Sequence, residues 1–287
     1  QTRDQRAAEA LEAAEWLGTV KEVDAGSVGV FGGSEGGDIA LLAGMREPCP
    51  AFVVPASASV GGSIFEVMRH RAESAGARLG LGAGEILKAV TFKELMYVFM
   101  SGADIVEWPL IEARVSAWGD DTWKEFAAIA RGRIDEAEGG AEDGQGREAA
   151  FETLKEVLAR FGGESWFAAT DAAGTLQRMT VMDARTFFLL LGSNRFSSDW
   201  DRTVCPAEVA GICCPLFALW GEYDSFLPPR ISASRLRSYL GGSGRSGDRI
   251  EVLAGGSHYL TTGGPSAPFV DGAFDSIASW IKGVTSP

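Results

Sequence analysis

The chain has 287 residues and a formal net charge of −13, and 46% of its residues are hydrophobic and 23% charged. This composition is that of a globular protein and excludes a wholly disordered chain, while the length suits one large domain or a core with a sizeable insertion. The negative charge argues against nucleic-acid binding by phosphate neutralisation, and the longest apolar runs fall far short of the ~20 residues that cross a bilayer.

Short apolar runs alternate with helical segments near both ends of the chain. Four runs are predicted as buried strands of a parallel sheet because each holds few polar residues. They are residues 27–32, 51–55, 215–220 and 249–253. Apolar residues recur at helical spacing in residues 4–17, 36–45 and 269–281. The alternation of strands and helices predicts an α/β fold.

The middle of the chain, residues 61–200, has a helical pattern throughout. Helices are predicted at residues 65–75, 85–100, 122–134, 148–161 and 182–191. The acidic, glycine-rich run 135–148 is predicted to be a mobile loop. Because so long a segment is too long for a loop in a compact domain, we expect a helical insertion. It holds five of the eight tryptophans, which we expect to form its own core, with a substrate pocket as the alternative.

The segment Gly32-Gly33-Ser34-Glu35-Gly36 has the pattern G-x-S-x-G between a predicted strand and a predicted helix. A nucleophilic serine on such a sharp turn needs small neighbours at Gly32 and Gly36, because side chains crowd its strained backbone. The turn also puts the Ser34 hydroxyl at a helix N-terminus, where backbone amides favour negative charge. The alternatives are a plain glycine-rich turn with an N-capping serine and a phosphate-binding loop, although neither the P-loop nor the G-x-G-x-x-G spacing is met.

A serine hydroxyl is a weak nucleophile that needs a base, and the chain offers two histidines. His70 lies between arginines on a predicted helix, and we interpret it as a solvated surface residue. His258 follows the predicted strand 249–253, on a loop at its carboxyl end. Catalytic groups of parallel sheets collect at that end, so we predict His258 as the base.

The acid that orients the base is expected on the loop after the predicted strand 215–220. That loop contains Glu222 and Asp224. We predict Asp224, since it lies further along the loop and a pair of prolines soon after it fixes the turn, and we keep Glu222 as the alternative. The order Ser34, Asp224, His258 is the nucleophile–acid–base order of the α/β-hydrolase fold.

On these residues the chain resembles the α/β-hydrolase superfamily, and within it the serine esterases, thioesterases and peptidase-like hydrolases that carry a helical cap. The matching segments are Gly32–Gly36, Leu219–Asp224 with the prolines after it, and Leu253–His258. The resemblance implies a hydrolase core at residues 1–60 and 201–287, with a helical cap at residues 61–200 between them.

The resemblance also implies a serine hydrolase that cleaves an ester, thioester or amide of a small-molecule acyl substrate through an acyl-enzyme on Ser34. It implies no metal and no organic cofactor. One alternative is an acyltransferase that passes the acyl group to an amine or alcohol with the same triad. The other is a non-catalytic binding protein on a hydrolase scaffold.

In such hydrolases half of the sheet and a first oxyanion-hole loop precede the nucleophile, whereas here only one predicted helix precedes it. The backbone N–H of Glu35 supplies one oxyanion donor, and no segment matches the second. The sequence also starts at Gln1 rather than Met, which we interpret as a processed or artificial end. We therefore expect the C-terminal half of a hydrolase sheet, completed by its own N-terminal fragment or by a second chain.

The cysteines are Cys49, Cys205, Cys213 and Cys214. They show no zinc-ligand spacing, and in a chain of this length we expect no disulfide framework. Few cysteines and no visible signal segment favour the cytoplasm, although the sequence does not fix the location. We expect neither a nucleic-acid partner nor a membrane span.

Overall fold

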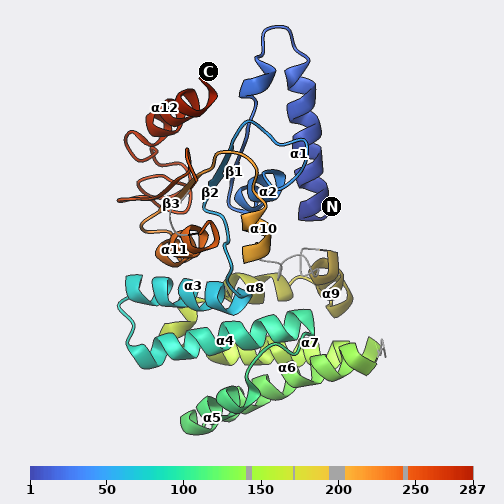
Figure 1. The fold of residues 1–287 in the computed structure, drawn as a ribbon. Coiled ribbons are helices and arrows are strands. Elements are labelled where there is room, and N and C mark those ends of the chain that lie inside the picture. The colour runs from blue at the N-terminus through green and yellow to red at the C-terminus, as the bar shows by residue number, and fades with distance from the viewer. Residues whose placement is uncertain (140–143, 171, 194–203, 242–244, 287) are drawn as a thin grey trace. The chain divides into compact units, whose positions relative to one another are not determined.

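A computed structural model describes residues 1–139, 144–170, 172–193, 204–241 and 245–286. Within these ranges the chain forms a four-stranded parallel sheet and a larger set of helices (Figure 1), which confirms the predicted α/β class. The chain divides into two compact units. We call residues 1–67 with 201–287 the sheet unit and residues 68–200 the helical unit.

The sheet unit contains all four strands predicted from the sequence. They are β1 (Val30–Gly33), β2 (Val53–Ala56), β3 (Phe217–Gly221) and β4 (Arg249–Leu253). They lie in the order β1-β2-β3-β4, and every neighbouring pair is parallel. Because all strands run the same way, the chain leaves each of them at one common edge, which we call the carboxyl edge of the sheet.

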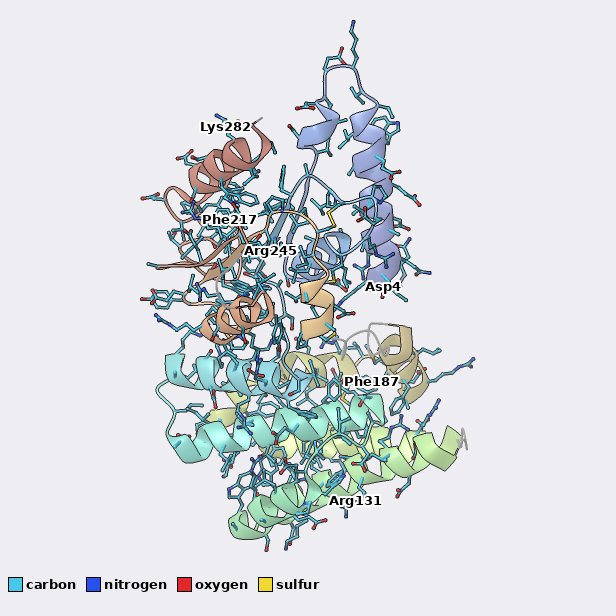
Figure 2. All side chains as sticks on the ribbon, viewed as in Figure 1. Asp4, Arg131, Phe187, Phe217, Arg245 and Lys282 are labelled. Atoms are coloured by element: carbon cyan, nitrogen blue, oxygen red, sulfur yellow. A yellow bond between two sulfur atoms is a disulfide. The ribbon has the colours of Figure 1, made fainter. Side chains whose placement is uncertain are left out.

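Two apolar cores cover the two faces of this sheet. The first receives Leu41 from α2 (Glu35–Ala43), Val209 from α10 (Pro206–Ala210) and Leu236 from α11 (Pro229–Tyr239). The second receives Ile277 from α12 (Ala273–Thr285). Successive strand residues alternate between the cores: Val53 joins the first, while Val54 and Phe217 (Figure 2) join the second. Strands buried on both faces have the continuous apolar sequence that made them predictable.

The first helix, α1 (Arg3–Gly18), packs against α2. It begins with a capping box, in which Gln5 N donates to Thr2 Oγ1 and Thr2 N donates to Gln5 Oε1. Ala7 and Leu11 share a small buried cluster with two residues of α2. The residues in that cluster from α2 are Leu42 and Ala43. α1 therefore supports the helix that follows Ser34.

Most of the remaining helices lie in the long segment between β2 and β3. They are α3 (Ile64–Arg78), α4 (Ala83–Ser101), α5 (Trp108–Trp118), α6 (Asp121–Gly139), α7 (Gly144–Phe161), α8 (Ala172–Met179) and α9 (Ala184–Ser193). Two short 3₁₀ helices, Ala25–Ser27 and Ser165–Ala169, complete the set. None of the helices described is both long and apolar enough to cross a membrane.

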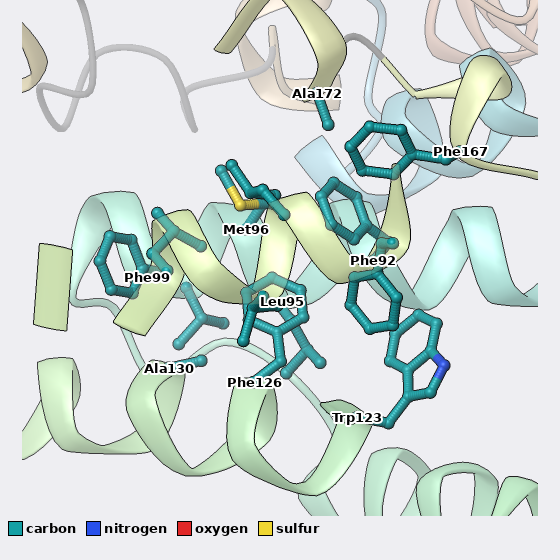
Figure 3. Close-up of a cluster of buried hydrophobic side chains, with 14 of the residues drawn as sticks. Phe92, Leu95, Met96, Phe99, Trp123, Phe126, Ala130, Phe167 and Ala172 are labelled. Carbon is teal, nitrogen blue, oxygen red and sulfur yellow. The ribbon is translucent and has the colours of Figure 1, made fainter. Parts of the chain in front are cut away.

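The helical unit has an aromatic core of its own (Figure 3). Trp123 and Trp166 are each only 1% exposed, and their ring centroids lie 5.2 Å apart. Phe92 contacts Trp166 with the ring centroids at 5.6 Å. The expectation that these tryptophans form a core is confirmed. Trp108 packs against this core while partly exposed, and it also lines a surface groove with the Arg131 guanidinium 4.4 Å from its ring centroid. Trp200 lies outside the described residues.

The predicted loop at residues 135–148 is wrong at both of its ends. α6 continues to Gly139, and α7 already begins at Gly144. Ile134 is buried, and Arg133 forms an ion pair with Glu136 three residues later, so packing and side-chain pairing extend the helix through an acidic sequence. The predicted mobility of residues 140–143 falls outside the described residues.

One disulfide joins Cys49, ahead of β2, to Cys213, ahead of β3, and appears as the yellow bond in Figure 2. The expectation of no disulfide framework is corrected to this extent, because the two residues are 164 positions apart and nothing local in the sequence pairs them. Burial raises the pKa of the neighbouring Cys214 thiol to about 11. That thiol stays protonated near neutral pH, which makes it a poor attacker of the adjacent bond.

Replacing both bonded cysteines, Cys49→Ala with Cys213→Ala, is expected to lower the free energy of unfolding by about 2–4 kcal/mol, because the bond restricts the unfolded chain. Urea denaturation without reductant measures the difference. Cys205→Ala, at an exposed free cysteine, is the matched control and should change little. An unchanged unfolding midpoint in the double variant would contradict the pairing.

Candidate active site

Ser34 lies at the turn from β1 into α2, with φ 56° and ψ −122°. A non-glycine residue in this region is strained, so the surrounding structure must hold it there. Its backbone N–H donates to Ala56 O of β2 at 2.8 Å. A Cβ on Gly32 would lie 2.0 Å from Gly36 O, so the turn requires glycine at position 32. A Cβ on Gly36 would have no neighbouring atom within 4 Å. The turn therefore has room for a side chain at position 36, and what matters there is the backbone carbonyl that Gly32 approaches.

Asp224 and His258 form a buried pair at the same carboxyl edge. His258 Nδ1 lies 2.9 Å from Asp224 Oδ2. Asp224 Oδ1 accepts the backbone N–H groups of Phe226 at 2.8 Å and Leu227 at 2.9 Å, which fixes the carboxylate. An ionised carboxylate can only accept, so in that form Asp224 would select the tautomer with the hydrogen on Nδ1 and leave Nε2 of the imidazole as the acceptor. That is the tautomer a general base needs.

The loop after β4 carries His258 across the carboxyl end of β3. The two loops are joined where Tyr223 N donates to Gly256 O at 2.7 Å. They also approach closely at Gly221, the last residue of β3, where an added Cβ would lie 2.1 Å from Ser257 O. Only glycine leaves room for this crossing.

Ser57, the residue after β2, completes the crossing, and it was not predicted from the sequence. It is 1% exposed and has φ 48°. Its hydroxyl donates to His258 O at 2.8 Å, and its N–H donates to Leu219 O at 2.7 Å. Ser34 N donates to the carbonyl of Ala56, the residue just before Ser57. The Ser57–His258 bond therefore holds the His258 backbone at the end of β2, the strand next to β1. The available signal was a polar residue at the carboxyl end of a predicted strand.

Ser34 and His258 O are therefore both bonded to residues at the end of β2, while no hydrogen bond joins the Ser34 hydroxyl to His258 among the described residues. Hydrogen bonds of this kind are often long without substrate and shorten when it binds. Glu222, the alternative acid, is engaged elsewhere: it accepts from Arg230 at 2.8 Å and from Gly255 N at 3.3 Å. His70 lies on α3, with Nε2 3.5 Å from Ser74 Oγ.

Two arginines of α1 bind two carboxylates in the first turn of α2. Arg6 holds Glu35 through both guanidinium Nη atoms, at 2.9 and 3.1 Å. Arg3 Nη1 lies 3.1 Å from Asp38 Oδ2. As the first residue of α2, Glu35 has a backbone N–H that the helix itself does not use. The arginines therefore fix the helix turn that presents this N–H beside Ser34.

Asp38 is the most perturbed group of this cluster. It is 2% exposed, and its Oδ1 accepts Ser59 N at 2.6 Å. Burial raises the pKa of Asp38 to about 7, while Arg3 and the Ser59 N–H act in the opposite direction. Near neutral pH its charge is therefore sensitive to small changes in acidity.

No protein-family model, curated protein or solved structure matches this chain. Across the residues that the structure describes, no group of three or more His, Cys, Asp and Glu side chains is placed to hold a metal ion.

Asp38 makes the stability of the fold depend on pH in a defined direction. A carboxyl whose pKa rises from 3.8 to about 7 on folding stabilises the folded state below pH 3.8 and loses that contribution as pH increases to 7. The loss is on the order of 4 kcal/mol. Asp38→Asn removes the titration, so the difference in unfolding free energy between wild type and variant should change by this amount between pH 4 and 7.

Urea denaturation across this pH range measures the difference. Asp275→Asn, at an exposed carboxyl of α12, is the matched control and should track the wild type. Parallel pH curves for wild type and Asp38→Asn would contradict the assignment.

Proposed function

We propose that this chain is a serine hydrolase that forms an acyl-enzyme on Ser34, with His258 as the base and Asp224 as the acid that orients it. The observation that carries the proposal is the buried Asp224–His258 hydrogen bond of 2.9 Å, on a loop tied by Ser57 to the strand end beside Ser34. The strained backbone of Ser34 supports the same reading, since such strain is characteristic of functional turns.

In the proposed reaction, Ser34 Oγ attacks the carbonyl carbon of an ester, thioester or amide while His258 Nε2 takes its proton. Asp224 stabilises the imidazolium that forms. The bond to the leaving group then breaks, and its heteroatom takes the proton from Nε2, which leaves the acyl group on Ser34. Water attacks this acyl group by the same route and regenerates the serine.

The negative oxygen of the tetrahedral intermediate needs hydrogen-bond donors, each contributing about 3–4 kcal/mol to the transition state. In the proposal one donor is the Glu35 N–H. The second comes from a strand added along β1, completing the sheet as expected from the sequence. Val30 N bonds to Phe52 O just ahead of β2, and Ser34 N bonds to Ala56 O of β2. The backbone groups of Phe31 and Gly33 therefore face away from β2. Phe31 is also 55% exposed, on a strand with one sheet neighbour among those described.

Ser34→Ala is expected to abolish labelling by a fluorophosphonate probe and to lower ester hydrolysis on the order of 10⁴-fold, because the nucleophile is lost. Intact-mass measurement of the labelled protein and an ester-hydrolysis assay test both points. Ser238→Ala, at an exposed serine of α11, is the control.

Absence of any label on wild-type Ser34 would contradict catalysis and favour a binding protein. Ester product that appears only when an amine or alcohol acceptor is added would instead favour acyl transfer.

The strand proposed along β1 has a separate test. Native mass spectrometry of the active protein as isolated is expected to show this chain bound to a second polypeptide. Backbone amides of Phe31 and Gly33 should then exchange slowly with deuterium, because the added strand protects them. An active species with the mass of this chain alone would contradict the added strand without affecting the role of Ser34.

A further inference from the structure

Two aromatic rings flank the imidazole of His258. The Phe226 ring, from the loop after β3, has its centroid 4.8 Å from that of His258 at an interplanar angle of 36°. The Tyr259 ring lies 5.4 Å away at 79°. Phe226 and Tyr259 also contact each other, with centroids at 6.4 Å and an angle of 67°. The three rings therefore form one cluster, built by two different loops.

The burial of this cluster is uneven. His258 is 9% exposed and Asp224 2%, whereas Phe226 keeps 38% and Tyr259 46% of their surface exposed. A half-exposed aromatic surface thus lies directly against a buried base. Exposed apolar surface of this kind is typical of a ligand site when a few fixed polar groups lie beside it.

The position of the rings relative to His258 decides which part of a substrate they meet. In the proposed mechanism His258 delivers its proton to the heteroatom of the leaving group, so groups packed on the imidazole border the leaving group rather than the acyl group. Phe226 and Tyr259 meet at 67°, which gives an incoming ring one face and one edge to contact. Aromatic pairs gain from such offset and edge-to-face contacts beyond the burial of apolar area.

We propose that Phe226 and Tyr259 form a leaving-group subsite that prefers an aromatic alcohol, such as the benzyl group of a benzyl ester. This inference rests on the proposed function, because it uses His258 as the proton donor. The ester C–O bond breaks, its electron pair stays on the alcohol oxygen, and that oxygen takes the proton from His258 Nε2. The products of this step are benzyl alcohol and the acyl group on Ser34.

The ratio of kcat/KM for benzyl acetate to that for cyclohexylmethyl acetate isolates the aromatic preference, because the acyl groups are identical and the alcohols are similar in size. The wild-type ratio is expected to be about five- to tenfold. Phe226→Leu and Tyr259→Leu, which remove a ring and keep an apolar side chain, should each bring the ratio towards one. Phe274→Leu is the matched control, since its exposed ring contacts Phe269, and it should leave the ratio unchanged.

A second measurement separates this inference from the proposed function. Binding of 4-fluorobenzyl alcohol, followed by ¹⁹F NMR, needs no turnover and can use Ser34→Ala protein. Phe226→Leu in that background should weaken binding about fivefold, and Phe274→Leu should not. If no ester is cleaved but this pattern holds, the proposed function fails and what stands is an aromatic-alcohol binding site at Phe226 and Tyr259. If esters are cleaved with equal ratios in wild type and Phe226→Leu, or if the alcohol does not bind, the subsite is overturned.

Discussion

The arrangement of the site depends on one backbone crossing, that of the loop after β4 over the end of β3. Neighbouring strands of a sheet lie about 4.8 Å apart, so a residue directly beyond β4 would be roughly 14 Å from one beyond β1. Gly221 removes the side chain that would block the crossing, and Ser57 bonds to His258 O where it ends. The Ser57 hydroxyl and the missing side chain of Gly221 thus decide where the His258 loop lies relative to the ends of β2 and β3.

The turn at Ser34, the other part of the site, is held in place by charged side chains of α1 and α2. The turn at Ser34 is unfavourable by itself, and such conformations persist only where their surroundings over-determine them. Arg6 supplies two hydrogen bonds to Glu35, and Ser59 N supplies one to Asp38. These contacts join α1, α2 and the chain after β2 around the turn. Burying the Asp38 carboxylate is the unfavourable part of this arrangement, because burial raises the pKa of Asp38 to about 7.

The four strands were predictable from the sequence because their signals are local. Buried parallel strands appear in the sequence as apolar runs. The glycine that the turn requires, Gly32, lies only two residues before Ser34. The roles of Ser57 and Gly221 depend on partners far along the chain: Ser57 bonds to a carbonyl 201 residues away. The junction of α6 and α7 was mispredicted for a related reason, since the packing of Ile134 outweighs the acidic residues that follow it. Distant contacts leave no local pattern to read.

The disulfide gives the molecule a covalent connection that its peptide backbone does not provide. The loop that the disulfide closes, from Cys49 to Cys213, includes β2 and the whole segment between β2 and β3 except residues 214–216. A protease that cuts once inside that segment would therefore produce two polypeptides still held in a single molecule, one carrying Ser34 and the other carrying Asp224 and His258. Electrophoresis would show that nicked form as one band until a reductant is added, and as two bands afterwards.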